Sequence, residues 1–245
     1  MSTHRLYVSD ALSAGDALVL SAEHSHYVAR VLRARPGDEL VLFDGRGGEH
    51  PASVLRASKH GVTVSIGAPR EGGHESPFMI RLFQGVSRRG RMDWVVQKAT
   101  ELGVARITPL VTEFSVVRFD DARADRRVAH WLKIAQGACE QCGRNRLPRI
   151  DRPQRFATAI DETRRGEAAR IVLHPSGQTS LSAVALPSAD AVLMIGPEGG
   201  LSDTELDAAS NAGFVTCRLG PRTLRTETAA LAAITVLQSR LGDLR

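Results

Sequence analysis

Two strand-loop-helix units near the C-terminus constrain the fold of this chain more than any other part of its sequence. Short apolar runs at 191–195 and 214–219 are each followed by a loop that contains Gly and Pro, and then by residues with helical spacing. Apolar runs of this length are typical of buried strands, and successive units of this kind imply a parallel sheet. Ligands of such sheets bind beyond the carboxyl ends of the strands, so we expect both loops to line one site.

The rest of the sequence predicts two domains. Short apolar or alternating runs separated by glycines, with one helical pattern at 23–32, predict a small β-barrel at the N-terminus. The segment 69–77 is rich in Gly and Pro and has no periodicity, so we interpret it as a linker. After Pro77, strands and helices alternate, which predicts an α/β domain. We place the domains at residues 1–72 and 73–245.

The composition is that of a cytoplasmic globular protein. The chain has 245 residues, its N-terminus lacks an apolar stretch suited to a signal peptide, and no apolar run approaches the roughly 20 residues that span a bilayer. The 32 Lys and Arg against 27 Asp and Glu give a net charge of +5, mostly from arginine. Arginine suits phosphate, so nucleic acid is a reasonable partner, although +5 can also simply keep a protein soluble.

The three cysteines predict neither a disulfide framework nor a metal site. Cys139 and Cys142 form a C-x-x-C pattern, but they fall within a helical pattern and no second pair completes a ligand set. We therefore expect no metal.

The first C-terminal loop, Gly196-Pro197-Glu198-Gly199-Gly200, lets a ligand approach the backbone. It fits neither the G-x-G-x-x-G pattern nor a P-loop, which disfavours pyrophosphate as the ligand. Ser202 and Glu205 fit a capping box at the start of the next helix, and Gly213 is placed to end that helix. A tight turn without a ligand is the alternative interpretation.

The second loop ends in Arg225-Thr226-Glu227, which opens a largely apolar helix. Thr226 is a plausible N-cap, and Glu227 would favour the positive end of the helix dipole. Arg225 has no such structural role, because a cation is unfavourable at a helix N-terminus. We therefore expect Arg225 to have an anionic partner, either a neighbouring carboxylate or a ligand.

At these loops the chain resembles a known family. The segments GPEGGLSDTEL and LGPRTLRTETAA, with KATELGVARITPLVTEFSVV and ACEQCGRNRLP upstream, are similar to the bacterial 16S ribosomal RNA (uridine-1498-N3)-methyltransferases, the RsmE type of SPOUT methyltransferase. The likeness runs from about Arg5 to the C-terminus. Four motifs in the same order make it specific, whereas either loop alone would suggest only a SPOUT-type cofactor site.

The resemblance implies a PUA-like β-barrel for RNA, followed by an α/β domain whose C-terminal part forms a trefoil knot and binds S-adenosylmethionine. General connection rules make knots a rare exception, so the knot rests on the resemblance alone. Three loops after parallel strands would hold the cofactor, and in this chain they match His174 to Gly177, Ile195 to Gly200 and Leu219 to Glu227. The implied cofactor-binding residues are His174, Ile195, Gly196, Pro197, Gly199, Gly200, Leu219, Gly220, Leu224 and Thr226.

The implied reaction moves a methyl group to N3 of a uracil. The N3 proton must leave, and charge that develops on the ring oxygens needs a donor. We expect Arg225 to stabilise that charge, and Glu198 and Glu227 are candidate bases. Each glutamate also has a structural explanation, in the turn for Glu198 and in dipole capping for Glu227.

The resemblance also implies a ribosomal RNA substrate, the small ribosomal subunit as partner, and a homodimer. The implied RNA-binding residues are Arg5, Arg30, Arg88, Arg89, Arg91, Arg144 and Arg146. We expect the loop arginines among them to be flexible and to meet phosphates. Two alternatives remain open: a ribose 2′-O-methyltransferase of the same fold, and a non-catalytic RNA-binding factor for ribosome assembly.

Overall fold

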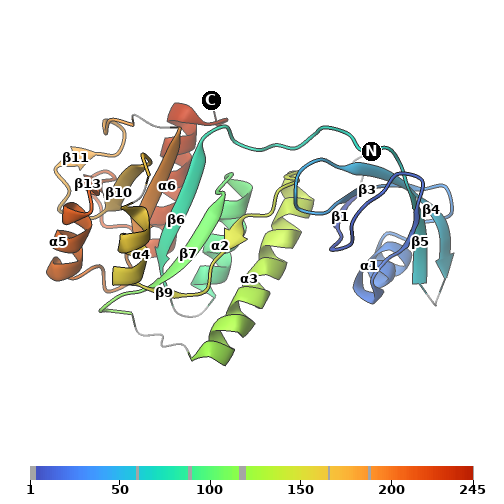
Figure 1. Ribbon diagram of the computed structural model, residues 1–245, viewed down its shortest axis with the longest axis horizontal. Coiled ribbons are helices and arrows are strands. Elements are labelled where there is room, and N and C mark those ends of the chain that lie inside the picture. Colours follow the sequence, from blue (N-terminus) through green and yellow to red (C-terminus); the bar gives the residue numbers. More distant parts are fainter. Residues whose placement is uncertain are drawn as a thin grey trace. The chain divides into compact units, whose positions relative to one another are not determined.

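The computed structural model describes residues 4–58, 61–87, 90–115, 120–164, 166–186 and 189–244; Figure 1 shows the helices and strands. The chain forms two compact units. The first comprises Met1–Glu75 and Gln136–Leu147, and the second comprises Ser76–Ala135 and Pro148–Arg245. The first unit is therefore discontinuous in sequence. The domain limits 1–72 and 73–245 stay a prediction.

The N-terminal unit is built on a mixed five-stranded sheet with the order β1-β3-β4-β5-β2. β1 pairs with β3 in parallel, and the other neighbours are antiparallel. Apolar residues alternate along the strands, so that Val62, Val64 and Ile66 of β5 are buried in one core. The strands are β1 (His4–Tyr7), β2 (Ala17–Val19), β3 (Glu39–Phe43), β4 (His50–Ser58) and β5 (Gly61–Ile66).

The predicted helix at 23–32 consists of α1 (Ala22–His26) and a π-helical turn, Tyr27–Val31. Ser21 caps α1, because its hydroxyl accepts a hydrogen bond from the backbone N–H of His24. The helical pattern therefore predicted the segment but not its wider final turn.

The second unit contains the parallel sheet that the sequence predicts. Its order is β11-β13-β10-β12-β6-β7-β8, with β9 also paired to β7, and every pairing among the described strands is parallel. The two-residue strands β8, β9 and β11 are too short to show a periodicity. The strands are β6 (Met79–Gly85), β7 (Arg106–Val111), β8 (Arg149–Ile150), β9 (Gln154–Arg155), β10 (Ala169–Leu173), β11 (Thr179–Ser180), β12 (Asp190–Ile195) and β13 (Val215–Arg218).

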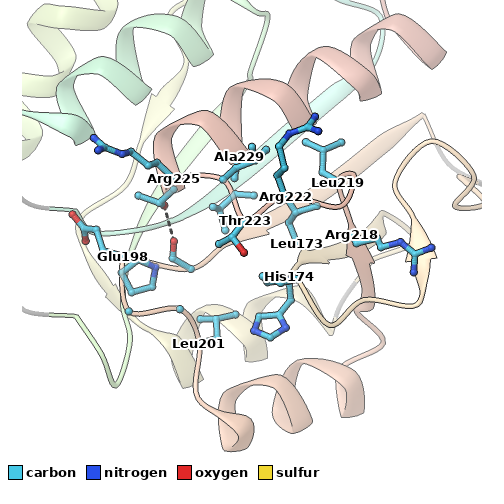
Figure 2. A pocket seen from close by; sticks show the side chains of 18 of the residues that line it. Leu173, His174, Glu198, Leu201, Arg218, Leu219, Arg222, Thr223, Arg225 and Ala229 are labelled. Carbon is cyan, nitrogen blue, oxygen red and sulfur yellow. Dashed lines mark hydrogen bonds between the residues drawn. The ribbon is translucent and has the colours of Figure 1, made fainter.

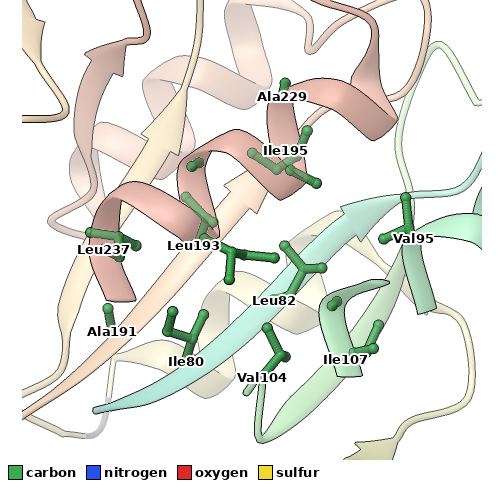
Figure 3. Packing of buried hydrophobic residues seen from close by; sticks show 14 of the residues in the cluster. Ile80, Leu82, Val95, Val104, Ile107, Ala191, Leu193, Ile195, Ala229 and Leu237 are labelled. Atoms are coloured by element: carbon green, nitrogen blue, oxygen red, sulfur yellow. The ribbon is translucent and has the colours of Figure 1, made fainter. Parts of the chain in front are cut away.

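Helices cover both faces of this sheet. One core contains Leu82, Leu193 and Ile195 from the strands together with residues of α2, α3 and α6, and Figure 3 shows this packing. The other core contains Met194 and Phe83 with residues of α4 and α5. Because β12 is covered on both faces, all its residues after Asp190 are buried. The helices are α2 (Arg91–Glu101), α3 (Asp121–Cys142), α4 (Phe156–Thr163), α5 (Asp203–Asn211) and α6 (Thr226–Leu241).

The predicted helix ends are confirmed at α5. Ser202 and Glu205 form both hydrogen bonds of the capping box, and Gly213 follows the helix with a φ of +83°. No helix in the described part of the chain is long and apolar enough to cross a membrane. The trefoil knot stays a prediction of the family resemblance.

Candidate functional site

The candidate site lies where three parallel strands end side by side. β10 pairs with β12 on one side and with β13 on the other, so the loops that follow them meet at one edge of the sheet. These loops enclose a cavity of about 600 Å³, a volume within the usual range for small-molecule sites. In Figure 2, Glu198 and Arg225 lie toward one end of the pocket and His174 and Arg218 toward the other.

All the predicted cofactor-binding residues line this cavity, as do Glu198, Arg225 and Arg91. Glu227 does not line it. Pro175, Pro221, Arg222 and Thr223 also line the cavity, and they lie within the predicted loops. Four further lining residues lie outside those loops and their types carry no distinct signal, although their position next to the loops could have indicated them: Leu173, Leu201, Arg218 and Ala229.

Thr226 joins two of the loops, and its predicted role as N-cap is wrong. Arg225 occupies the N-cap position, with a β-region backbone and no capping bond from its side chain. The Thr226 hydroxyl donates to the carbonyl of Gly196 at 2.6 Å and accepts from Nε2 of the buried Gln84 at 2.8 Å. The start of α6 is thereby tied to the loop after β12 and to β6.

We expect Thr226→Val to destabilise the protein by about 1–3 kcal/mol, because it leaves the Gly196 carbonyl and a Gln84 N–H without this partner. Urea unfolding followed by circular dichroism measures the change. Thr235→Val is the matched control, since the exposed Thr235 hydroxyl bonds only within α6. Equal stability of the two variants would mean that the Thr226 bridge contributes nothing.

Two glycines let the loops approach neighbouring backbone closely. A Cβ on Gly85, at the end of β6, would lie 2.6 Å from the carbonyl carbon of Gly196. A Cβ on Gly177 would lie 2.5 Å from the carbonyl carbon of Cys217. Both distances are shorter than real Cβ contacts, so the shape of the cavity depends on glycine at these positions. Gly85 is not among the residues predicted from the sequence.

Arg91 connects the two candidate bases. Its Nη1 lies 2.8 Å from Oε1 of Glu198, and its Nε lies 3.9 Å from Oε1 of Glu227. Arg91 begins α2, and it lines the cavity rather than lying on a remote surface. The predicted RNA contact at Arg91 therefore lies at the mouth of the same site as the carboxylates.

Arg225 and Glu227 lie at the start of α6, beside or at the cavity, and each has a charged group without a full set of partners among the described residues. Oε2 of Glu227 is buried and has no hydrogen-bond partner among the described residues. Dipole capping by Glu227 does not account for this oxygen, since a buried acceptor normally finds a donor. Arg225 is exposed, and no carboxylate of the described residues pairs with it. Of the two anionic partners expected for Arg225, a ligand therefore remains.

Two family models and several curated relatives match this chain. A family model described as the RNA methyltransferase domain matches residues 74–238, and one described as the RNA methyltransferase PUA domain matches residues 20–67. The ribosomal RNA small subunit methyltransferase E of Buchnera aphidicola subsp. Schizaphis graminum is 34% identical over 98% of this chain and 97% of its own length. That of Bacillus subtilis is 30% identical over 92% of this chain and 91% of its own.

The chain belongs to the ribosomal RNA small subunit methyltransferase E family.

Two solved structures extend this assignment to three dimensions. The methyltransferase E of Neisseria gonorrhoeae, bound to S-adenosylmethionine, is 36% identical, with a TM-score of 0.91 and full coverage of both chains. A Legionella pneumophila protein solved with the same cofactor bound is 42% identical, with a TM-score of 0.92 and full coverage of both chains. The family and the α/β fold with an N-terminal PUA domain, which the sequence predicts, are thereby confirmed.

In this methyltransferase the predicted RNA-binding arginines fall into different environments. Arg144 is only 3% exposed and pairs with Glu75 at 2.9 Å, so the expectation of a flexible loop side chain is wrong for it. Arg5 is also largely buried, against Glu49 at 2.6 Å and over the ring of Phe43. Arg30 and Arg146 are exposed. Arg88 and Arg89 lie outside the described residues.

The C-x-x-C cysteines lie at the end of α3. Burial raises the pKa of the Cys139 thiol to about 12, so this thiol stays protonated at neutral pH. Among the described residues, no group of three or more His, Cys, Asp or Glu side chains is placed to hold a metal ion. The expected absence of a metal stays a prediction.

Proposed function

We propose that this chain transfers a methyl group from S-adenosylmethionine to N3 of uridine 1498 in 16S ribosomal RNA. The observation that carries the proposal is the cavity at the ends of β10, β12 and β13, in a fold shared with relatives that bind this cofactor. The names of the curated relatives support ribosomal RNA of the small subunit as the substrate.

The residues of the cavity fit the cofactor. Leu173, Ile195 and Leu224 offer apolar surface for the adenine ring, and the glycine-containing loops bring backbone polar groups to the cavity. Gly200 and Gly220 have φ values of +77° and +71°, which allow these turns without side chains. When bound, the cofactor supplies a methyl group on a positively charged sulfur, so no metal is needed.

We assign the proton transfer to Glu227 and the charge stabilisation to Arg225. The buried, unpartnered Oε2 of Glu227 is suited to accept the proton of uracil N3. Glu198 is already hydrogen-bonded by Arg91, which makes it the weaker candidate. Arg225 supplies the cation for the charge that develops on the ring oxygens as the proton leaves. Arg91 positions both carboxylates.

We further propose that the enzyme is a homodimer that acts on the small ribosomal subunit in the cytoplasm. The largely apolar α6 supports the dimer, because Leu231, Ala232 and Val236 are only partly buried in the single chain. Light scattering of the purified protein would give the mass expected for two chains, and the mass of one chain would contradict the dimer.

The decisive experiment is in vitro methylation of purified small subunits and of naked 16S ribosomal RNA, followed by mass spectrometry of the modified nucleoside. We expect a methyl group on N3 of a single uridine. A methyl group on a ribose would replace the N3 assignment with the 2′-O alternative. If calorimetry detects no binding of S-adenosylmethionine at millimolar concentration, the alternative of a non-catalytic assembly factor is favoured.

A further inference from the structure

Two exposed arginines that are far apart in the sequence lie side by side in the N-terminal unit. The backbone around Arg46 pairs antiparallel with the backbone around Arg146. The N–H of Gly47 donates to the carbonyl of Asn145, and the N–H of Leu147 donates to the carbonyl of Gly45, each at 3.1 Å. The positions of the two arginines are therefore fixed by main-chain hydrogen bonds within one unit.

The guanidinium of Arg146 rests directly on Gly47. A Cβ at Gly47 would lie 3.0 Å from Nε and from Nη2 of Arg146, and 3.1 Å from its Cζ. Gly47 also has a φ of +108°, a conformation that favours glycine. The arginine head group thus lies against a bare stretch of backbone, next to the side chain of Arg46, which is 79% exposed.

Two glutamates of this region are paired with other arginines. Glu75 accepts from Nε and Nη2 of Arg144, and also from the backbone N–H groups of Asn145 and Arg146. Glu49 accepts from Arg5, and this hydrogen bond, more than any other contact, keeps the pKa of Glu49 below its usual value.

The charges of Arg46 and Arg146 are left available to a ligand. Among the described residues no carboxylate forms an ion pair with Arg146. Oδ2 of Asp44 lies 3.9 Å from Nε of Arg46, a long contact to a largely exposed side chain and of little energetic value. Oδ1 of Asp44 accepts a hydrogen bond from the backbone N–H of Arg46 at 2.9 Å. The two buried arginines neutralise the two glutamates, and the two exposed arginines carry a net positive charge.

We propose that Arg46 and Arg146 form one binding site for a phosphate group of the RNA backbone. Because the backbones at Arg46 and Arg146 are paired, both side chains start from one place on the unit. Each guanidinium is a planar donor fork, and such forks match phosphate oxygens. A phosphate contact fixes the position of an RNA without reading its sequence. The proposal rests on the proposed function for the identity of the RNA, and it adds a place on the N-terminal unit where that RNA is held.

The test is the double variant Arg46→Ala/Arg146→Ala, with binding to a 16S ribosomal RNA transcript measured by fluorescence anisotropy at several salt concentrations. We expect affinity to fall about tenfold, and the slope of log K against log salt to become shallower by about 1. Arg56→Ala/Arg127→Ala is the matched control, because it removes the same charge from exposed positions elsewhere. This control should keep the wild-type slope.

The variant Gly47→Ala tests the position of the Arg146 head group separately from its charge. It keeps both arginines but displaces the Arg146 head group, so we expect a loss of RNA affinity smaller than that of the double variant. Circular dichroism should give the wild-type spectrum for every variant and so establish that each has folded, and calorimetry with S-adenosylmethionine should show that the site in the other unit is unchanged.

The outcomes distinguish this site from the proposed function. A wild-type protein that binds the transcript but methylates neither the transcript nor purified small subunits would contradict the function and leave the site intact. An active wild-type protein whose double variant keeps the wild-type affinity and salt slope would overturn the site. Weaker binding to intact subunits alone, with unchanged binding to the transcript, would mean that the arginines contact a ribosomal protein.

Discussion

Replacing Arg225 by alanine is expected to lower kcat by about 10²–10³-fold while the fold and the affinity for S-adenosylmethionine are retained. Arg225 is exposed at the N-cap of α6, lines the cavity and has no carboxylate partner among the described residues. Its removal therefore costs little stability and takes away the cation next to the developing charge. Single-turnover methylation of small subunits measures the rate, and calorimetry measures the cofactor affinity.

Arg225→Lys is an informative second variant, because lysine keeps the positive charge but lacks the planar donor fork of the guanidinium. We expect it to recover part of the lost rate. If Arg225→Ala instead has wild-type kcat and a raised KM, the side chain binds substrate in the ground state and has no role in the chemical step.

The second large effect is expected for Glu227→Gln, with kcat lower by about 10²–10⁴-fold. The amide has nearly the shape of the carboxylate but cannot take the N3 proton. Because Glu227 does not line the cavity, the affinity for S-adenosylmethionine should stay at the wild-type value. The same single-turnover assay and calorimetry measure both quantities.

Glu198→Gln is the matched control, since it also removes one carboxylate beside Arg91. We expect a much smaller loss of rate, because Glu198 already accepts a hydrogen bond from Arg91. A large loss in Glu198→Gln together with a nearly active Glu227→Gln would reverse the two roles. Equal losses would indicate that Arg91 and both carboxylates act as one unit.

The sequence predicted the position of the site because its signals are local. The strand β12 is a continuous apolar run after Asp190, β13 lies within the predicted run at 214–219, and the capping box from Ser202 to Glu205 spans only four residues. Parallel strands place their following loops at one edge, so the cavity could be located without knowledge of the strand order. The β10 loop lies between the other two because β10 pairs with both neighbouring strands.

The sequence could not predict contacts between residues far apart along the chain. Thr226 has the residue type and position of an N-cap, yet its hydroxyl bonds to Gly196, 30 residues away. Arg144 follows a helix like a surface arginine, but Glu75, 69 residues earlier, holds it in the interior. Residue type gives the charge of a side chain, whereas its burial depends on the partner that the fold supplies.

The discontinuity of the N-terminal unit has a consequence for the order of events during synthesis. Glu75 takes its hydrogen-bond donors from Arg144, Asn145 and Arg146, and Arg5 bonds to both Glu49 and Asn145. A nascent chain that ends before Gln136 lacks these groups, so its first 75 residues would leave Glu49 and Glu75 without part of their polar contacts. The first unit can therefore be completed only after the chain has passed through Ser76–Ala135 of the second unit, and a fragment cut after Glu75 should be less stable than the same residues in the whole protein.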